Sequence, residues 1–455
     1  MRFWQPGLRF ALLLLAATSA MTAQLSHEAT GLAIESDDGA LVIPNQGTLD
    51  ERPFFSTRRH PAIAYDQPAS DPVADLARKV DEGIVQLRFG GRGGYLLSVL
   101  EALGVPAESQ SVVFSKTSLQ SHYISPSNPR AIFFSDDVSI AFIRDAPLLE
   151  ISALDPKQGV VFYAIENRQS GRPRIVRSDS CLSCHETRNS MDVPGLLARS
   201  MAVGRGGETM PQYGNYVSDH RSPFEERWGG WFITGRPGTA RHMGNEMLES
   251  DGTGRLMAGV PKPLGSLAGW FDPDGYASES SDVAAVMVLD HQVRMTNLLT
   301  RVGWETRIAL ERLEKHPQER ETVMRLIAAD SRELADYMLF VDEAPLPGEF
   351  KSLSGFPARF AAAGPKDSRG RSLRQIDLTK RLLRYPCSYM IYSRAFDALP
   401  DAARENVYTR LWDVLSGKDK ASKYSRISSA DRAAIVSILL ETKPGLPAYY
   451  RRLEK

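Results

Sequence analysis

The chain has 455 residues, of which 42% are hydrophobic and 9% aromatic, enough apolar material to build a packed core. This composition argues against a disordered, collagen-like or disulfide-scaffold protein. Lys and Arg together number 55, as do Asp and Glu, so no basic excess is available to neutralise a nucleic-acid backbone. Three cysteines are too few for a disulfide framework in a chain of this length. The length indicates two or three domains of about 150 residues each.

The N-terminal segment has the pattern of a secretory signal peptide. Two arginines precede a short apolar run at residues 10–17, and small residues follow it. We expect residues 1–23 to be removed, with the cut after Ala20 or Ala23. The apolar run is short for a membrane span, and a retained membrane anchor is the alternative. The pattern predicts a periplasmic or secreted protein with no stable membrane insertion after cleavage.

The first half of the mature chain indicates an α+β domain. Residues 24–72 are rich in proline and predict an extended arm. Helical spacing of apolar residues begins at residue 73, and a second helix is expected over 95–103. Strands are predicted over 111–118, 131–144, 148–154, 159–167, 196–203, 213–220 and 229–235. We therefore expect residues 73–250 to form a domain with a mostly antiparallel sheet.

The second half indicates helices only. Residues 251–276 contain six glycines and three prolines and predict a linker. Residues 277–455 are expected to form an all-helical C-terminal domain. Its helices are predicted over 281–315, 318–340, 373–384, 401–415 and 429–442. The predicted fold class is thus α+β, with a sheet domain followed by a helical domain.

One motif carries recognisable chemistry. Residues 181–185 read Cys181-Leu182-Ser183-Cys184-His185, the C-x-x-C-H signature of covalent c-type haem attachment. Two thiols three positions apart can each add to one vinyl group of the porphyrin, and the histidine that follows can bind the iron. We expect one covalent haem c, held by Cys181 and Cys184, with His185 as an axial ligand.

Other interpretations of the same residues have to be compared with haem attachment. A zinc site normally needs a second Cys or His pair at short spacing, whereas Cys387 stands alone. A thioredoxin-like dithiol would want an apolar strand leading directly into the first cysteine, and residues 177–180 are mostly polar. Chance occurrence is the last alternative. Because haem is attached outside the cytoplasm, the signal peptide and the motif support the same interpretation.

The sequence also resembles a known family. The segments CLSCHETRNSMDVPGLLARS, DHRSPFEERWGGWFITG, RHMGN, LDHQVRMTNLLTR and YPCSYMIYSRAFDALP are similar to exported single-haem c-type cytochromes, described as cytochrome c domain-containing proteins. The resemblance covers most of the mature chain and implies haem binding and electron transfer. A weaker resemblance links it to haem c domains of PAS-like fold, in which the motif is embedded in a sheet.

A second axial ligand has to come from elsewhere in the chain. His291 lies at the centre of an apolar stripe on the predicted helix 281–315, so we expect it to be the distal iron ligand. The alternative is a core histidine that is hydrogen-bonded to a neighbour. His242, in a glycine-rich loop over 238–244, is the second candidate. Cys387 is interpreted as a buried free thiol, with a thiolate ligand as the alternative.

These residues lead to a hypothesis about function. Arg227, Arg236 and Arg241 are candidates to pair with the haem propionates, because arginine binds carboxylates through two hydrogen bonds. We expect an electron-transfer protein whose redox partner is a protein of unknown identity. A peroxidase-like haem enzyme and a haem-based sensor, each with an open distal position, are the alternatives. No P-loop, Rossmann or Ser-His-Asp signature offers competing chemistry.

Overall fold

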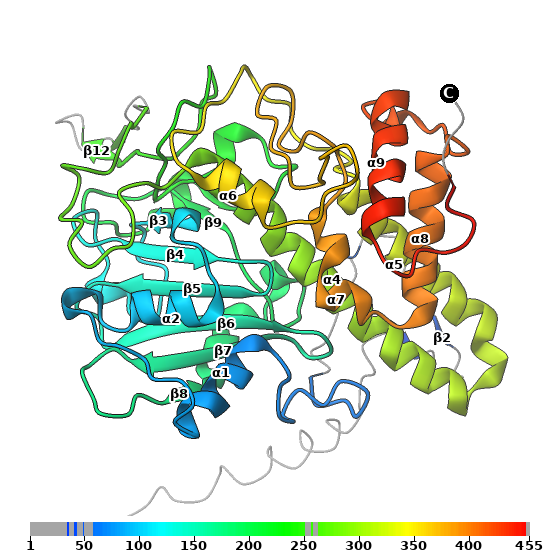
Figure 1. Ribbon diagram of the computed structural model, residues 1–455, viewed down its shortest axis with the longest axis horizontal. Coiled ribbons are helices and arrows are strands. Elements are labelled where there is room, and N and C mark those ends of the chain that lie inside the picture. The colour runs from blue at the N-terminus through cyan, green and yellow to red at the C-terminus, as the bar shows by residue number, and fades with distance from the viewer. Residues whose placement is uncertain are drawn as a thin grey trace, which may run out of the picture.

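The computed structural model describes residues 58–250 and 263–451, together with Leu49 and the short strand pieces at 34–35, 41–42 and 256–257. The predicted signal peptide and most of the predicted arm lie outside the described residues. A sheet occupies one side of the molecule in Figure 1, and a group of helices occupies the other. In the described part of the chain, no helix combines the length and the apolar character needed to cross a membrane.

The sheet has seven antiparallel strands in the order β11-β3-β4-β5-β6-β7-β8. Its strands are β3 (Ser111–Val113), β4 (Arg130–Phe134), β5 (Val138–Ile143), β6 (Leu148–Asp155), β7 (Gly159–Glu166), β8 (Ile175–Arg177) and β11 (Trp231–Phe232). Strands β4 to β8 follow one another through direct connections, as expected for an antiparallel meander. A separate two-stranded ribbon pairs β9 (Arg199–Met201) with β10 (Asn215–Val217).

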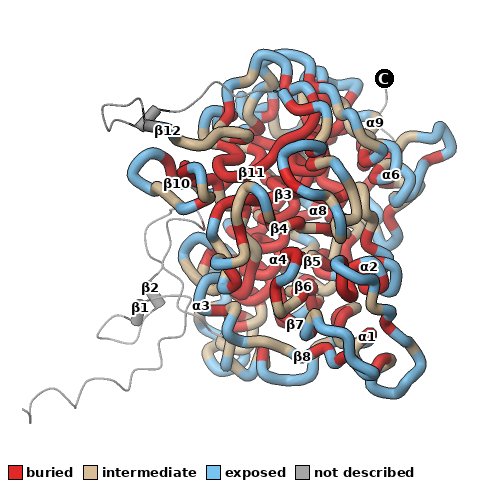
Figure 2. The backbone as a smooth tube through the Cα atoms, turned by 90° about the vertical axis from the view of Figure 1, so that its left-hand side faces the viewer, coloured by how far each residue is buried: buried red, intermediate tan, exposed pale blue. Residues whose placement is uncertain are grey.

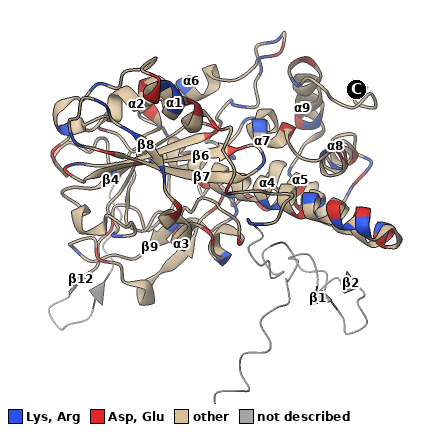
Figure 3. Ribbon diagram, turned by 90° about the horizontal axis from the view of Figure 1, so that it is seen from below, with Lys and Arg blue, Asp and Glu red and all other residues tan. Residues whose placement is uncertain are grey.

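One face of the sheet is covered by α1 (Pro72–Asp81) and α2 (Leu96–Leu103). Asp71 caps α1 by accepting hydrogen bonds from the backbone nitrogens of the first turn, and Tyr163 of β7 donates its hydroxyl proton to the same carboxylate. Gly104 ends α2 at a φ of 64°, which a residue with a Cβ rarely adopts. Figure 3 shows these two helices on one side of the sheet, with α3 and β9 on the other.

The second half is helical, as the sequence predicts. Its helices are α4 (Val283–Lys315), α5 (Arg320–Met338), α6 (Phe356–Ala362), α7 (Arg394–Asp397), α8 (Asp401–Leu415) and α9 (Ser429–Thr442). The bounds of α8 and α9 are those predicted, and Ser428 caps α9 by accepting from the backbone nitrogen of Asp431 at 3.1 Å. The predicted fold class, an α+β sheet region followed by helices, is confirmed.

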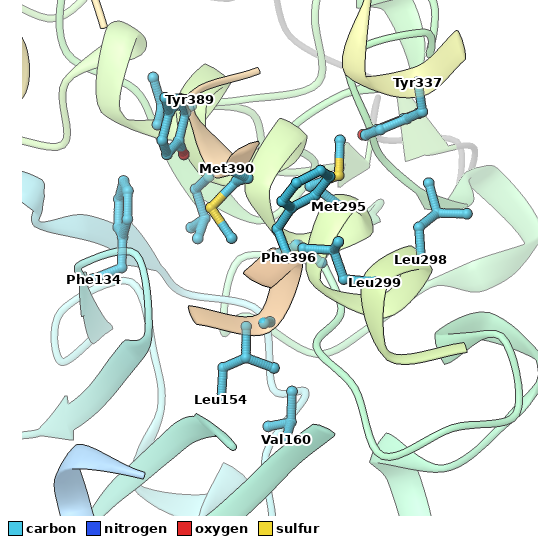
Figure 4. Packing of buried hydrophobic residues seen from close by; sticks show 14 of the residues in the cluster. Phe134, Leu154, Val160, Met295, Leu298, Leu299, Tyr337, Tyr389, Met390 and Phe396 are labelled. Atoms are coloured by element: carbon cyan, nitrogen blue, oxygen red, sulfur yellow. The ribbon is translucent and has the colours of Figure 1, made fainter. Parts of the chain in front are cut away.

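The two halves share one hydrophobic core. Leu154 and Val160 of the sheet, Met295 and Leu298 of α4, and Phe396 of α7 belong to one continuous cluster of buried side chains. Figure 4 shows this packing, and Figure 2 shows the buried residues concentrated along α4 and the middle strands. The predicted linker therefore separates two kinds of secondary structure that share a core.

The helix predicted over 373–384 is wrong. The described chain forms turns there, with one isolated bridge between Ile376 and Leu383. The Asp377 carboxylate accepts from the backbone nitrogen of Thr379 at 2.8 Å, and Leu378 has a φ of 60°. An aspartate that binds the backbone two residues ahead offers an alternative to the helical hydrogen bond. The local turn outweighs the apolar spacing that suggested a helix.

Candidate cofactor site

The C-x-x-C-H motif lies at one edge of the sheet. Strand β8 ends at Arg177, a 3-10 turn spans Asp179–Cys181, and the short helix α3 spans Leu182–His185. A strand, β8, thus does precede the motif, although the polar residues 177–180 had suggested that no apolar strand leads into Cys181. It is an edge strand of an antiparallel meander, whereas a thioredoxin-like dithiol belongs to a parallel βαβ unit.

The two motif cysteines are free thiols near the surface. Cys184 is exposed and Cys181 is partly buried. Burial raises the pKa of Cys181, against smaller opposing effects that include its contact with Ser178. A nucleophilic dithiol needs a lowered thiol pKa, which favours the thiolate form. The environment of Cys181 therefore does not favour the thioredoxin-like alternative. The exposed position of Cys184 leaves its sulfur open to chemical attachment, whereas Cys181 packs partly against the core.

The imidazole of His185 is held in one orientation. Its Nδ1 lies 2.9 Å from the carbonyl oxygen of Gly195, and its ring packs on Phe162 of β7 at a centroid distance of 4.9 Å. The carbonyl accepts the Nδ1 proton, which leaves Nε2 with a lone pair; no hydrogen bond to Nε2 occurs within the described residues. Burial lowers the pKa of His185 and keeps the ring neutral. These are the properties of an imidazole prepared to bind a metal.

Next to the motif, the sheet presents a face that no helix covers completely. Five side chains lie in register from β4 to β8, and we call them the open row: Ile132, Ala141, Glu150, Ala164 and Val176. The first four are only partly buried, and Val176 is 52% exposed. Side chains alternate between the two faces along a strand. The neighbouring side chains of these strands therefore point to the opposite face of the sheet, where they are buried under α1 and α2.

Four of the five members of the open row are apolar, and the fifth, Glu150, is a carboxylate at its centre. Two of its five members are alanines, and Phe162, which contacts His185, lies on the same face because it is two positions from Ala164. The small, partly exposed side chains of Ala141 and Ala164, on either side of Glu150, leave room for a flat apolar group. The residues present therefore fit a porphyrin attached through α3.

Arg130, at the start of β4, was not among the residues singled out from the sequence. It lies two positions before Ile132, so its side chain is on the same face as the open row. No hydrogen bond or ion pair to its guanidinium occurs among the described residues, and its Nε is enclosed without a partner. After burial, the largest effect, its positive charge is a smaller effect that also lowers the pKa of His185.

His291 lies in the core, with both ring nitrogens already hydrogen-bonded. Its Nδ1 is 2.8 Å from Nδ1 of His220, and its Nε2 is 2.8 Å from the hydroxyl of Ser388. Its ring stacks on Tyr337 and Phe340 at centroid distances of 5.3 and 4.3 Å. Iron could bind only by displacing one of the two hydrogen bonds. The structure therefore favours the alternative of a hydrogen-bonded core histidine, and no contact in the described chain joins His291 to His185.

His242 keeps one nitrogen available. Its Nδ1 accepts from the backbone nitrogen of Gly244 at 3.0 Å, whereas no hydrogen bond to its Nε2 occurs within the described residues. Burial beside Trp228 lowers the pKa of His242 to about 4, so the ring is neutral at pH 7. The neighbouring Met243 contacts Ser200 of β9, on the side of the sheet that carries α3. No contact in the described chain joins His242 to His185 either, and His242 is a candidate for the distal ligand only through the nitrogen that it keeps free.

The other residues singled out from the sequence have ordinary structural positions. Cys387 is fully buried, and burial raises its pKa to about 12, as for an inert core thiol. Arg227 is buried and donates to the carbonyl oxygens of His220 and Ser222. Arg236 and Arg241 are exposed. None of these three arginines has a contact that links it to the motif.

Comparisons with protein-family models, curated proteins and solved structures found no match to this chain. The resemblance to exported single-haem cytochromes therefore stays an expectation. Among the described residues, no three His, Cys, Asp or Glu side chains are grouped so that they could hold a metal ion by themselves. A zinc site at the motif would need such a group, whereas haem brings four nitrogen ligands of its own and needs only one or two from the protein.

Proposed function

We propose that this protein is an exported c-type cytochrome that carries one covalently attached haem and transfers electrons. The observation that carries the proposal is the state of His185. Its Nδ1 is fixed by the carbonyl of Gly195, its Nε2 is free, one thiol (Cys184) directly precedes it, and the other (Cys181) lies one helical turn before it. Cys181 and Cys184 would hold the haem through thioethers, and His185 would bind its iron.

The surroundings of the motif support the same proposal. The four apolar members of the open row offer a surface on which a porphyrin can lie beside Glu150, and burying apolar area contributes about 25 cal/mol per Å². When bound, the haem supplies a one-electron couple. Because Cys184 is exposed, the attached edge of the cofactor would lie near the molecular surface, within reach of a redox partner protein. Export is part of the proposal, because haem is attached outside the cytoplasm and residues 1–23 have the pattern of a signal peptide.

The coordination state tests the electron-transfer part of the proposal. We expect optical spectra of the purified protein, oxidised and reduced, to be those of a six-coordinate low-spin haem that does not bind carbon monoxide. Two strong axial ligands leave no open position, which suits a carrier of electrons. A high-spin haem that binds carbon monoxide readily would contradict this part and favour a haem enzyme or a sensor.

The distal ligand can be assigned by two matched variants. We expect His242→Ala to convert the low-spin haem to high spin and to open it to carbon monoxide, because His242 is a buried neutral imidazole with a free nitrogen. His291→Ala, which removes an imidazole with no free nitrogen, should leave the spectrum unchanged. If neither variant changes the spin state of a low-spin haem, the ligand is another residue, such as a methionine.

A further inference from the structure

Arg130 differs from the other arginines that the fold encloses. Arg301 pairs with Glu305 at 2.7 Å, Arg374 pairs with Asp136, and Arg227 donates to two backbone carbonyls. For the partly buried Arg130, by contrast, the described residues supply no hydrogen bond and no ion pair. Withdrawing a charged group from water without a partner is costly, so such a group indicates an interaction that the chain alone does not complete.

The nearest carboxylate does not fill this role. The charge of Glu150, on the open row, raises the pKa of Arg130, but burial lowers it by more. No ion pair joins the two side chains. The Oε1 atom of Glu150 accepts hydrogen bonds from the side-chain amide of Gln120 at 3.1 Å and from the hydroxyl of Ser118 at 3.4 Å, which direct this carboxylate toward the loop before β4. The Arg130 guanidinium thus stays available for an external anion.

The position of Arg130 indicates which anion it would meet. His185 packs on β7, whereas Arg130 lies on β4, three strand spacings or about 14 Å across the same face. The open row runs between the two positions. Thioethers hold a haem by the edge that carries its vinyl groups, and the two propionates extend from another part of the ring. A haem attached at α3 and lying along the open row would present its carboxylates toward β4.

We infer that Arg130 binds a haem propionate and so fixes how the attached haem lies on the sheet. This assignment rests on the proposed function. Arginine suits the role because its planar guanidinium binds a carboxylate through two parallel hydrogen bonds. Its positive charge, held beside the cofactor, disfavours the extra positive charge of ferric haem and so raises the reduction potential.

The test compares three variants of the full-length holoprotein, matured with its haem. Arg130→Leu should retain the covalent haem, but its reduction potential should fall and the propionate bending band in the resonance Raman spectrum should shift. Arg130→Lys keeps the charge and loses the paired hydrogen bonds, so its potential should stay near that of the wild type while the band shifts. Arg88→Leu is the control, because Arg88 forms an exposed ion pair with Glu101 beside α2. It should change neither quantity.

The stability of the apoprotein separates a cofactor-binding role from a structural one. Replacing an unpaired, partly buried charge by an apolar side chain should leave the free energy of unfolding unchanged or raise it. An Arg130→Leu apoprotein that is clearly less stable than Arg88→Leu would contradict the inference. An Arg130→Leu holoprotein with the potential and propionate band of the control would do so as well.

Three further outcomes separate a failure of this inference from a failure of the proposed function. If Arg130→Leu does not accumulate, Arg130→Lys decides, and an unchanged propionate band overturns the inference. If the wild-type protein loses all its haem on denaturation, the proposed function fails and the inference fails with it. Haem that is retained, with no effect of Arg130, overturns the inference alone.

Discussion

A variant with both Cys181→Ala and Cys184→Ala is expected to release all its haem on denaturation, whereas the wild-type chain retains one haem. The thioethers are the only covalent link that we propose, and axial coordination by His185 is lost when the chain unfolds. Haem staining of a denaturing gel measures retention directly. The pyridine haemochrome spectrum of the wild type should be that of a haem with two thioethers.

Variants with a single cysteine replaced test whether each motif thiol forms its own thioether. Cys184→Ala should leave one thioether and shift the haemochrome band toward longer wavelength, because one vinyl group stays unsaturated. Cys387→Ala is the matched control, since its thiol is fully buried and the variant should retain haem with the wild-type spectrum. If the colour of the wild-type protein is lost on denaturation, the haem is not covalently attached and the proposed function is wrong.

The sequence predicts well those features whose signals are local. Helices α8 and α9 have the expected bounds, and the Ser428 cap of α9 is a contact between residues three apart. The C-x-x-C-H motif is local in the same sense, because it depends on the spacing of three side chains, and the haem that it predicts stays a proposal. The turn at Asp377 is also local, but a helix-like apolar pattern conceals it.

Features that depend on tertiary packing could not be predicted. The stripe on α4 indicates that His291 is buried, but not that His220 and Ser388 satisfy its nitrogens. Arg130 looks like any arginine at the start of a strand. Its significance depends on the register of five strands and on the part of that face that α4 leaves uncovered. No single-residue pattern carries that information.

The buried pair of His220 and His291 should make the protein sensitive to acid. Burial lowers the pKa of His291 to about 3, and burial together with the neighbouring His291 lowers the pKa of His220 well below its ordinary value. In the unfolded chain both titrate near 6.5. The unfolded state therefore binds more protons below that pH, and the free energy of unfolding falls as the pH drops from about 6.5 toward 3. At pH 5 the loss is about 2 kcal/mol for a histidine that stays neutral in the fold.

His291→Ala should show this effect as a changed pH profile. At pH 7.5 the variant should be less stable by about 3 kcal/mol, because it loses two hydrogen bonds and leaves a cavity between Tyr337 and Phe340. The variant has no buried imidazole whose protonation the folded state prevents, so it does not lose this part of its stability in acid. The difference between the two free energies of unfolding should therefore shrink to about 1 kcal/mol at pH 5. Urea denaturation of the apoprotein at both pH values measures the two differences.

The control for this profile is His122→Ala, because His122 is an exposed histidine. It should change the free energy of unfolding by less than about 0.5 kcal/mol and leave its pH dependence unaltered. The same His291→Ala protein, loaded with haem, decides between the two interpretations of His291. A loss of stability with an unchanged low-spin spectrum identifies a core histidine. A change to high spin, with carbon monoxide binding and little effect on apoprotein stability, would mean that haem attachment rearranges the core and that His291 is the iron ligand after all.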